Sequence, residues 1–178
     1  MFVGIGGNLS SPRFGPPEAV MAAAVDALPA AGIFVQRRSR WYRSAPVPPS
    51  AQPPFINGVL HVRASPSLNS VLAALHTIEA EFGRVRGERN AARILDLDLL
   101  ACGSLVLDRP GGVQVPHPRL HLRTFVLLPL IELAPDWRHP RLNRTAVQLL
   151  ADMPAEVAAG QWAKVIPEDR PELDERGG

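Results

Sequence analysis

Two aspartates one residue apart, Asp96 and Asp98, are the residues of this chain best suited to chemistry. They lie in the run from Ile94 to Leu100, where all the other residues are isoleucine or leucine. This alternation predicts a short strand, whose side chains point to opposite faces in turn at about 3.3 Å per residue. Both aspartates then project from one face, about 7 Å apart, and repel each other by roughly 2 kcal/mol at an effective dielectric constant near 20. A cation between them would relieve that repulsion.

The cation that best suits such a pair is magnesium. Mg²⁺ takes one or two carboxylates and completes its octahedron with water and the phosphates of a nucleotide. Two ions about 3.5 to 4 Å apart would fit between side chains at this spacing. The alternative is that Asp96 and Asp98 form salt bridges to neighbouring arginines. The wider pattern favours the metal site.

An arginine-rich segment leads directly into this strand. Most charge runs are solvated surface, and that alternative stays open here. Only Glu88 opposes the positive charge, however, and a glycine-containing loop over residues 87–92 separates the segment from the strand. We therefore expect a mobile loop that closes over a triphosphate, with bidentate guanidinium contacts to the phosphates. The arginines are Arg84, Arg86, Arg89 and Arg93.

Two further pairs of residues are candidates for ligand contacts. Asn57 follows Phe55 by two residues in a predicted strand, so both side chains lie on one side of it. An amide suits the edge of a heterocycle and an aromatic ring offers a stacking surface, although a core phenylalanine beside a backbone-bonded asparagine is the alternative. His117, between two prolines, and Arg123 are candidate phosphate contacts, although a lone loop histidine is more often structural.

Length and composition favour one small globular domain. The chain has 178 residues, 46% of them hydrophobic, and we expect a single domain over residues 1–166 with a polar tail over 167–178. No apolar stretch approaches the roughly 20 residues of a membrane span, and the start lacks the pattern of a signal peptide. The single cysteine, Cys102, agrees with a reducing compartment. We expect a cytoplasmic monomer that binds neither nucleic acid nor membrane.

The expected elements define a fold class. Their order is strand, helix, two strands, helix and strand, with additions at the C-terminal end, which is typical of a ferredoxin-like α+β sandwich with helices packed on an antiparallel sheet. The expected strands and extended pieces cover 2–6, 33–44, 55–64, 94–100, 105–107 and 125–130, and the expected helices cover 17–28, 67–82 and 145–150.

Several stretches spread over roughly residues 1–137 form a recognisable series. They are GIGGNLS, YRSAPV, QPPFINGV, IEAEFGRVRGER, RILDLDLL, VPHPRL, RTFVLLPL and IELAPDW. In these stretches, and in their order, the chain resembles the 6-hydroxymethyl-7,8-dihydropterin pyrophosphokinase family of folate biosynthesis. The string from Gly83 to Leu100 is the most specific part of the resemblance.

The resemblance implies a ferredoxin-like enzyme that binds ATP and then the pterin, and moves the β,γ-pyrophosphoryl group to the hydroxymethyl oxygen with release of AMP. It implies that Asp96 and Asp98 hold two Mg²⁺ ions and act in catalysis with Arg84 and Arg93. The pterin pocket would consist of Ser44, Ala45, Val47, Phe55, Asn57 and Phe125. The nucleotide would contact His76, Glu79, Arg84, Arg86, Arg89, Arg93, Leu99, Gln114, His117 and Arg123.

The chain departs from the family pattern in the arginine loop. Asn90, Ala91 and Ala92 stand where the family usually has tryptophan, glycine and proline, so a stacking residue is missing there.

Two rival functions remain. Palm-type nucleotidyl transferases also place paired carboxylates and two metals on a ferredoxin-like sheet, and they release pyrophosphate. A non-enzymatic RNA-binding module is the other, although buried aspartates on the sheet argue against it.

Overall fold

The structure is a computed structural model that describes residues 1–64, 67–84, 90–108 and 112–167. The strands are β1 (Phe2–Gly7), β2 (Ile33–Arg38), β3 (Tyr42–Ser44), β4 (Phe55–Ala64), β5 (Asp96–Ala101), β6 (Leu107–Asp108), β7 (Gln114–Val115) and β8 (Ala163–Val165). The helices are α1 (Pro17–Ala27), α2 (Leu68–Glu81), α3 (Thr124–Leu133), α4 (Ala146–Ala151) and α5 (Ala155–Ala158), with 3₁₀ turns at Leu28–Ala31 and Leu120–Leu122.

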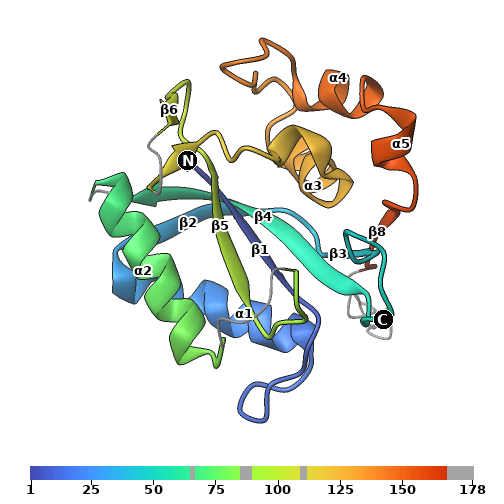
Figure 1. Ribbon diagram of the computed structural model, residues 1–178. Coiled ribbons are helices and arrows are strands. Elements are labelled where there is room, and N and C mark those ends of the chain that lie inside the picture. The colour runs from blue at the N-terminus through green and yellow to red at the C-terminus, as the bar shows by residue number, and fades with distance from the viewer. Residues whose placement is uncertain (65–66, 85–89, 109–111, 168–178) are drawn as a thin grey trace, which may run out of the picture.

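The main sheet has the order β5-β1-β4-β3-β8, and β2 pairs with another part of β4. Every pairing in it is antiparallel. If β2 and β3 are counted as one interrupted strand, the elements from β1 to β5 follow the β-α-β-β-α-β order of the ferredoxin-like fold. The predicted α+β class is therefore confirmed, with α1 and α2 beneath the sheet as Figure 1 is drawn.

The first core lies between one face of the sheet and the helices α1 and α2. In α2, Val71, Leu75 and Ile78 recur at helical spacing and are buried, as the periodicity predicts. Ser67 caps this helix by accepting a hydrogen bond from the backbone N–H of Ser70 at 3.3 Å. Leu97 and Leu99 of β5 enter the same core. Burial of these leucines fixes which face of β5 carries the aspartates.

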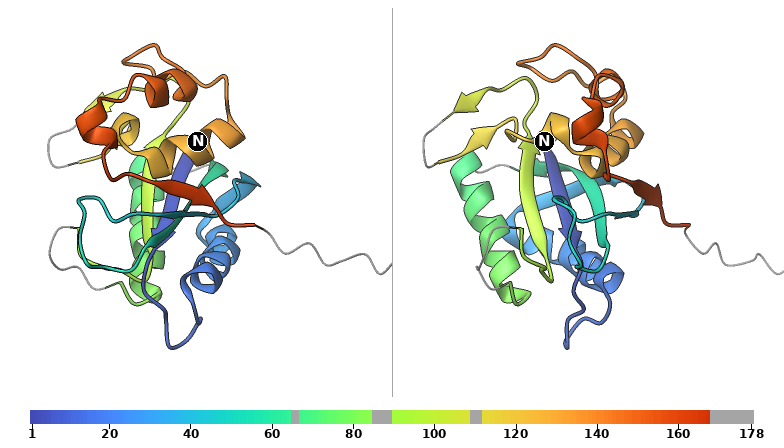
Figure 2. Two further views of the ribbon diagram at one scale, coloured as in Figure 1. Left: turned by 90° about the vertical axis from the view of Figure 1, so that its right-hand side faces the viewer. Right: turned by 45° about the vertical axis from the view of Figure 1, so that its right-hand side comes forward.

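The C-terminal additions cover the other face of the sheet, as the two views of Figure 2 show. Leu127 and Leu130 of α3 are fully buried in a second core with Val59 of β4 and Leu100 of β5. Helix α4 packs behind α3 in the same core. Its N-terminus has the reciprocal capping box of Thr145 and Gln148. Helix α4 therefore begins within one residue of the expected start at 145, and the short helix α5 after it was not predicted.

Two of the predicted extended pieces differ from the structure. The segment 125–130 is helical and belongs to α3, although Pro129 lies inside that helix. Proline removes one backbone donor from a helix, and a run of apolar residues reads equally as strand or buried helix. Burial between the sheet and α4 decides the outcome. The piece at 105–107 is reduced to β6, which pairs with β7.

Most of the predicted polar tail, residues 168–178, lies outside the described residues, and the division at residue 166 stays a prediction. Within the described ranges, no helix combines the length and hydropathy needed to cross a bilayer. Cys102 is a free thiol, partly buried and packed against the first core.

Candidate active site

The floor of the site is a row of residues paired across four strands. Asp96 of β5 lies opposite Gly6 of β1, Gly6 opposite Asn57 of β4, and Asn57 opposite Tyr42 of β3. Directly opposed residues share a face of the sheet, so the side chains of Asp96 and Asn57 project from the same face. Gly6 lies between them and has no side chain to separate them. Asp98 likewise faces Gly4. The predicted projection of both aspartates from one face is confirmed, and it is the face that α3 covers.

A cavity of about 440 Å³ lies over this row. Its far wall consists of the residues that begin α3 and of the loop at 117–119, and its sides consist of the loops at 44–48 and 90–93 and the inner side of α2. Most of the predicted site residues line it together. They are His76, Glu79, Arg84, Arg93, Asp96, Asp98, His117 and Arg123, with Ser44, Ala45, Val47, Phe55, Asn57 and Phe125.

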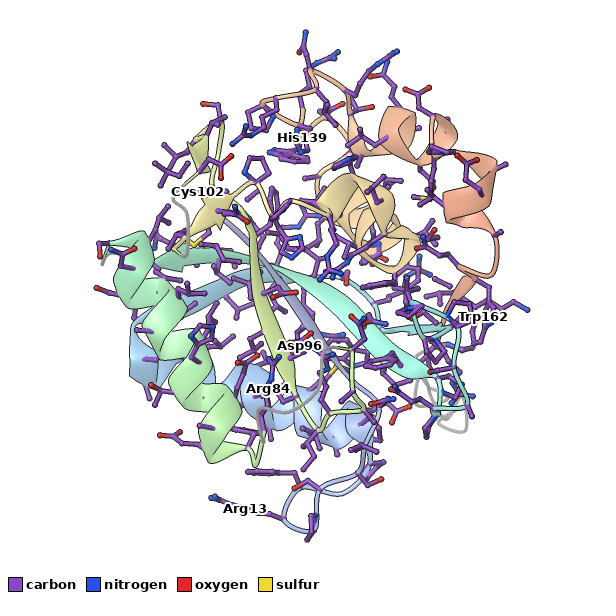
Figure 3. The ribbon with its side chains drawn as sticks, in the orientation of Figure 1. Arg13, Arg84, Asp96, Cys102, His139 and Trp162 are labelled. Atoms are coloured by element: carbon purple, nitrogen blue, oxygen red, sulfur yellow. The ribbon has the colours of Figure 1, made fainter. Side chains whose placement is uncertain are left out.

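Asp96 lies between two guanidinium groups. Arg84 Nη1 donates to Asp96 Oδ1 at 2.5 Å and Arg93 Nη1 to Oδ2 at 2.9 Å. Figure 3 shows Arg84 and Asp96 close together near the lower end of β5. Burial, and then repulsion from Asp98, raise the pKa of Asp96, while the two arginines oppose this. The ion pairs considered as the alternative to metal binding are therefore formed at Asp96 in this structure.

Glu79 holds Arg84 from behind. It is 2% exposed on the side of α2 that faces β5, and its carboxylate accepts hydrogen bonds from Arg84 and from the backbone N–H of Leu97 at 2.6 Å. Burial raises the pKa of Glu79. Burial alone would lower the pKa of Arg84, but Asp96 and Glu79 outweigh it and raise that pKa. Arg84 is therefore a fixed cation at the cavity wall.

Asp98 is more open than Asp96, with 39% of its side chain exposed. Arg123 Nη1 lies 3.5 Å from Asp98 Oδ2, and His117 Nε2 lies 4.0 Å from the same oxygen. Burial, together with Arg123 and Arg119, lowers the pKa of His117 to about 4, against the opposing effect of Asp98. At neutral pH His117 is uncharged, and its Nδ1 accepts the backbone N–H of Arg119 at 3.1 Å. Its Nε2 then carries the proton and can donate to an anion.

Asn57 is 8% exposed, and its Nδ2 donates to Ser44 Oγ at 2.8 Å. Its carbonyl Oδ1 lies beside the bare Gly6, where an added Cβ would come within 2.6 Å of it. Phe55 begins β4, and Phe125 lies in the first turn of α3 with the Arg123 guanidinium 5.5 Å from its ring centroid. The cavity thus offers an amide edge and aromatic faces at one end, and charges at the other.

Two predicted nucleotide contacts, Leu99 and Gln114, do not line the cavity, and two others fall outside the described residues. The Leu99 side chain is buried in the first core, so it does not line the cavity. Gln114 in β7 is exposed and donates to Asp108 Oδ1 at 3.0 Å, also away from the cavity. Arg86 and Arg89 lie outside the described residues. Contacts of all four with ATP stay predictions.

Sequence reasoning missed a residue that holds three loops together. Asn8 is 4% exposed; its Oδ1 accepts the backbone N–H of Arg93 at 2.9 Å and its Nδ2 donates to the Pro53 carbonyl at 3.1 Å. Gln52 adds a bond from its Nε2 to the Asn90 carbonyl at 3.0 Å. The GGN turn after β1 was the only local signal for it. Arg119, in the loop with His117, lines the cavity as a further cation.

The donors present fit Mg²⁺ if a nucleotide supplies the other ligands. A carboxylate has about four acceptor positions, and the arginines occupy two of those of Asp96, while Asp98 is more open. Within the described ranges no three His, Cys, Asp or Glu side chains gather to hold a metal without such help. Two acids of this kind are what Mg²⁺ uses when phosphates and water complete its octahedron.

A ferredoxin-like sheet with paired acids, clustered guanidinium groups and an adjoining aromatic slot is the arrangement expected of an enzyme that transfers a phosphorus-containing group. Comparison with known proteins defines the class more narrowly. A family model described as 7,8-dihydro-6-hydroxymethylpterin-pyrophosphokinase matches residues 2–135. The chain belongs to this family and is a transferase.

Individual relatives agree with this assignment. The chain is similar to the 2-amino-4-hydroxy-6-hydroxymethyldihydropteridine pyrophosphokinase of Synechocystis sp., with 42% identity over 83% of this chain and 73% of that protein. It is 41% identical to the Pseudomonas aeruginosa protein of the same name over 88% of this chain and 93% of that protein. It is also 39% identical to the mitochondrial folate synthesis bifunctional protein of Arabidopsis thaliana, over 57% of this chain and 18% of that protein.

Proposed function

We propose that this protein transfers the β,γ-pyrophosphoryl group of ATP to the hydroxymethyl oxygen of 6-hydroxymethyl-7,8-dihydropterin in folate biosynthesis, with release of AMP. The observation that carries the proposal is the division of one cavity into two chemically different ends. Asp96, Asp98, Arg84 and Arg93 gather at one end, and Asn57 with its aromatic neighbours lies at the other. The family assignment supports the same reaction.

At the polar end, the chain supplies fixed cations for a triphosphate. Asp96 and the buried Glu79 hold Arg84, and Asp96 and the Ala91 carbonyl hold Arg93, before any ligand arrives. Cations fixed in this way stabilise charge as it develops on phosphate oxygens, without reorganisation during the reaction. His117, neutral at pH 7, would donate a hydrogen bond from Nε2, and Arg123 would add a charge from the opposite wall.

At the other end, the chain supplies recognition of a flat heterocycle. Asn57 would pair its amide with the pterin edge, and Phe55 and Phe125 would contact the faces of the ring. The main-chain groups near Ser44, Ala45 and Val47 would complete the pocket. No nucleophilic side chain is needed, because the substrate hydroxyl attacks the β-phosphorus directly and catalysis rests on positioning.

Two Mg²⁺ ions would bind at Asp96 and Asp98, and when bound they would neutralise charge on the bridging and leaving phosphate oxygens. The residues themselves orient the donor and acceptor. ATP is the co-substrate in this proposal. A monomeric state, a cytoplasmic location and the lack of nucleic-acid or membrane partners also stay predictions.

The test is product analysis with purified protein, ATP, Mg²⁺ and the reduced pterin. We expect AMP and the pterin pyrophosphate, and we expect Asp98→Ala to abolish AMP formation while circular dichroism and the melting temperature stay close to wild type. Asp152→Ala is the matched control, because Asp152 is an exposed carboxylate paired with Arg144 outside the cavity. Formation of ADP, or of no product, by wild type would contradict the proposal.

The same assay separates the rival functions. A palm-type nucleotidyl transferase would release pyrophosphate instead of AMP. An RNA-binding module would form no product, and its affinity for RNA would fall steeply with salt and ignore Mg²⁺ and pterin.

A further inference from the structure

A glutamine near the C-terminal end of the described chain contacts both sides of Arg123. Gln161 Oε1 accepts the backbone N–H of Thr124 at 3.1 Å, and its Nε2 donates to the carbonyl of Leu122 at 3.0 Å. The same Nε2 donates to the Val157 carbonyl at 2.6 Å. One side chain therefore holds the residues immediately before and after Arg123, whose guanidinium approaches Asp98.

The contact with Thr124 replaces a missing helix cap. Helix α3 has Arg123 at its N-cap position, and arginine has no side-chain oxygen to accept the free N–H groups of the first turn. Gln161 supplies that acceptor from a segment 37 residues away. The first turn of α3 carries Phe125, so the direction in which Phe125 and Arg123 face the cavity depends on this capping bond.

Trp162, the next residue, bonds to the loop at 44–48, which forms one side of the cavity. The carbonyl of Trp162 accepts the backbone N–H of Ala45 at 3.0 Å, and Ala163 of β8 pairs with Ser44 of β3. Figure 3 shows Trp162 at the outer edge of the molecule beside β3. Gln161 and Trp162 thus join the first turn of α3 to the loop at 44–48, and the pterin is expected between these two parts.

We propose that Gln161 is a positioning residue that sets the width and geometry of the pterin slot through the first turn of α3. The inference rests on the function proposed above and concerns residues that do not touch the reacting atoms. Gln161 also lines a second cavity, of about 310 Å³, behind Arg123 and Val47, so the α3 turn has space to shift if this clamp is lost.

The first experiment measures binding of 6-hydroxymethylpterin by calorimetry in the presence of Mg²⁺ and a nonhydrolysable ATP analogue. Gln161→Met keeps the length of the side chain and removes its hydrogen bonds. We expect its pterin Kd and its KM for the reduced pterin to rise roughly three- to thirtyfold, the range that the loss of a helix cap implies. Affinity for the ATP analogue should change less, since Arg123 is only one of the cations expected at the phosphates, and Arg84 and Arg93 are held independently of Gln161.

Gln148→Met is the matched control. Gln148 also caps a helix of the C-terminal additions, through Thr145, but it does not line the cavity. We expect it to lower the melting temperature about as much as Gln161→Met and to leave pterin binding within twofold of wild type. Equal loss of pterin affinity in both variants would reduce the role of Gln161 to general stability and overturn the proposal.

A second readout needs no ligand. Hydrogen exchange of the amides of Thr124 and Phe125 should accelerate in Gln161→Met and stay unchanged in Gln148→Met. Unchanged protection in both variants would overturn the positioning role whatever the substrate is. Failure of the wild type to bind pterin would instead refute the proposed function, so the two failures are distinguishable.

Discussion

The bare position at Gly6 gives the sharpest prediction of the site geometry. A Cβ built on Gly6 would lie 2.6 Å from Asn57 Oδ1 and 3.3 Å from the carbonyl oxygen of Ile56. A relaxed carbon–oxygen contact is about 3.3 Å or longer, so the Asn57 amide must move by about 0.7 Å. Since Asn57 Nδ2 donates to Ser44 Oγ at 2.8 Å, that movement lengthens or breaks the bond.

The magnitude for Gly6→Ala follows from these contacts. Overpacking of a well-filled region costs about 1 to 3 kcal/mol, and a broken hydrogen bond about 0.5 to 1.5 kcal/mol. The favourable change from glycine to alanine within a strand offsets about 0.5 to 1 kcal/mol of this. We expect a net destabilisation of about 0.5 to 4 kcal/mol and a pterin affinity reduced by at least about tenfold, with nucleotide affinity nearly unchanged.

Gly4→Ala, on the same strand, is the control. The atoms nearest to its added Cβ would be the two methyl carbons and Cγ of Leu100, at 3.4 to 3.5 Å, which are ordinary contacts. We expect Gly4→Ala to leave stability unchanged or to raise it slightly. Alanine loses less conformational entropy than glycine when a strand forms, and no close contact offsets this gain. Denaturant unfolding and pterin calorimetry measure both variants. The reasoning is refuted if Gly6→Ala is as stable as Gly4→Ala and binds pterin within twofold of wild type.

Three further predictions test other parts of the molecule. Asn57→Ala should weaken pterin binding at least about tenfold and leave ATP-analogue binding unchanged in calorimetry, and equal losses for both ligands would contradict the pocket assignment. Glu79→Gln should unfold near the wild-type denaturant midpoint, because it keeps an acceptor for the backbone N–H of Leu97. Glu79→Ala removes that acceptor, and its free energy of unfolding should fall by about 1 to 3 kcal/mol. Equal midpoints for the two variants would contradict this reasoning. Burial, with His121 and Arg141 nearby, lowers the pKa of His139, so this residue binds a proton more readily in the unfolded chain below pH 6.5. Its share of the stability should be lost as the pH is lowered, by at most about 1.4 kcal/mol per pH unit. A plot of melting temperature against pH from 7 to 5 should be less steep for His139→Gln than for wild type, and parallel plots would refute the assignment.

The sequence predicts the parts of this molecule that depend on local periodicity. Burial of Leu97 and Leu99 decides the face of β5, and with it the common direction of Asp96 and Asp98. The bounds of β4 and the cap of α2 at Ser67 follow from equally local patterns. These features are predictable because each depends on residues within one or two turns.

Other features depend on contacts between distant segments. The hydrogen bond from the Arg93 N–H to Asn8 joins residues 85 apart, and no periodicity signals it. Helix α3 forms despite Pro129 because its apolar residues fill the space between the sheet and α4, which the local sequence does not reveal. The side chain of Leu99, an expected nucleotide contact, lies in the first core. A residue matched by its place in a family motif can still have its side chain in the core, so only its backbone remains available to a ligand.

Core and cavity share one face of the sheet, with no layer between them. Along that face Phe2 and Val59 pack beneath α3, while Gly6 and Asn57, farther along the same strands, form the floor of the cavity. Leu100 belongs to both regions: it is 1% exposed in the second core and also lines the cavity. Interiors are close-packed and transmit small displacements, so the seating of α3 on its core sets the position of the first turn that faces the substrates. Stability of the second core and the geometry of the site are therefore coupled through one helix.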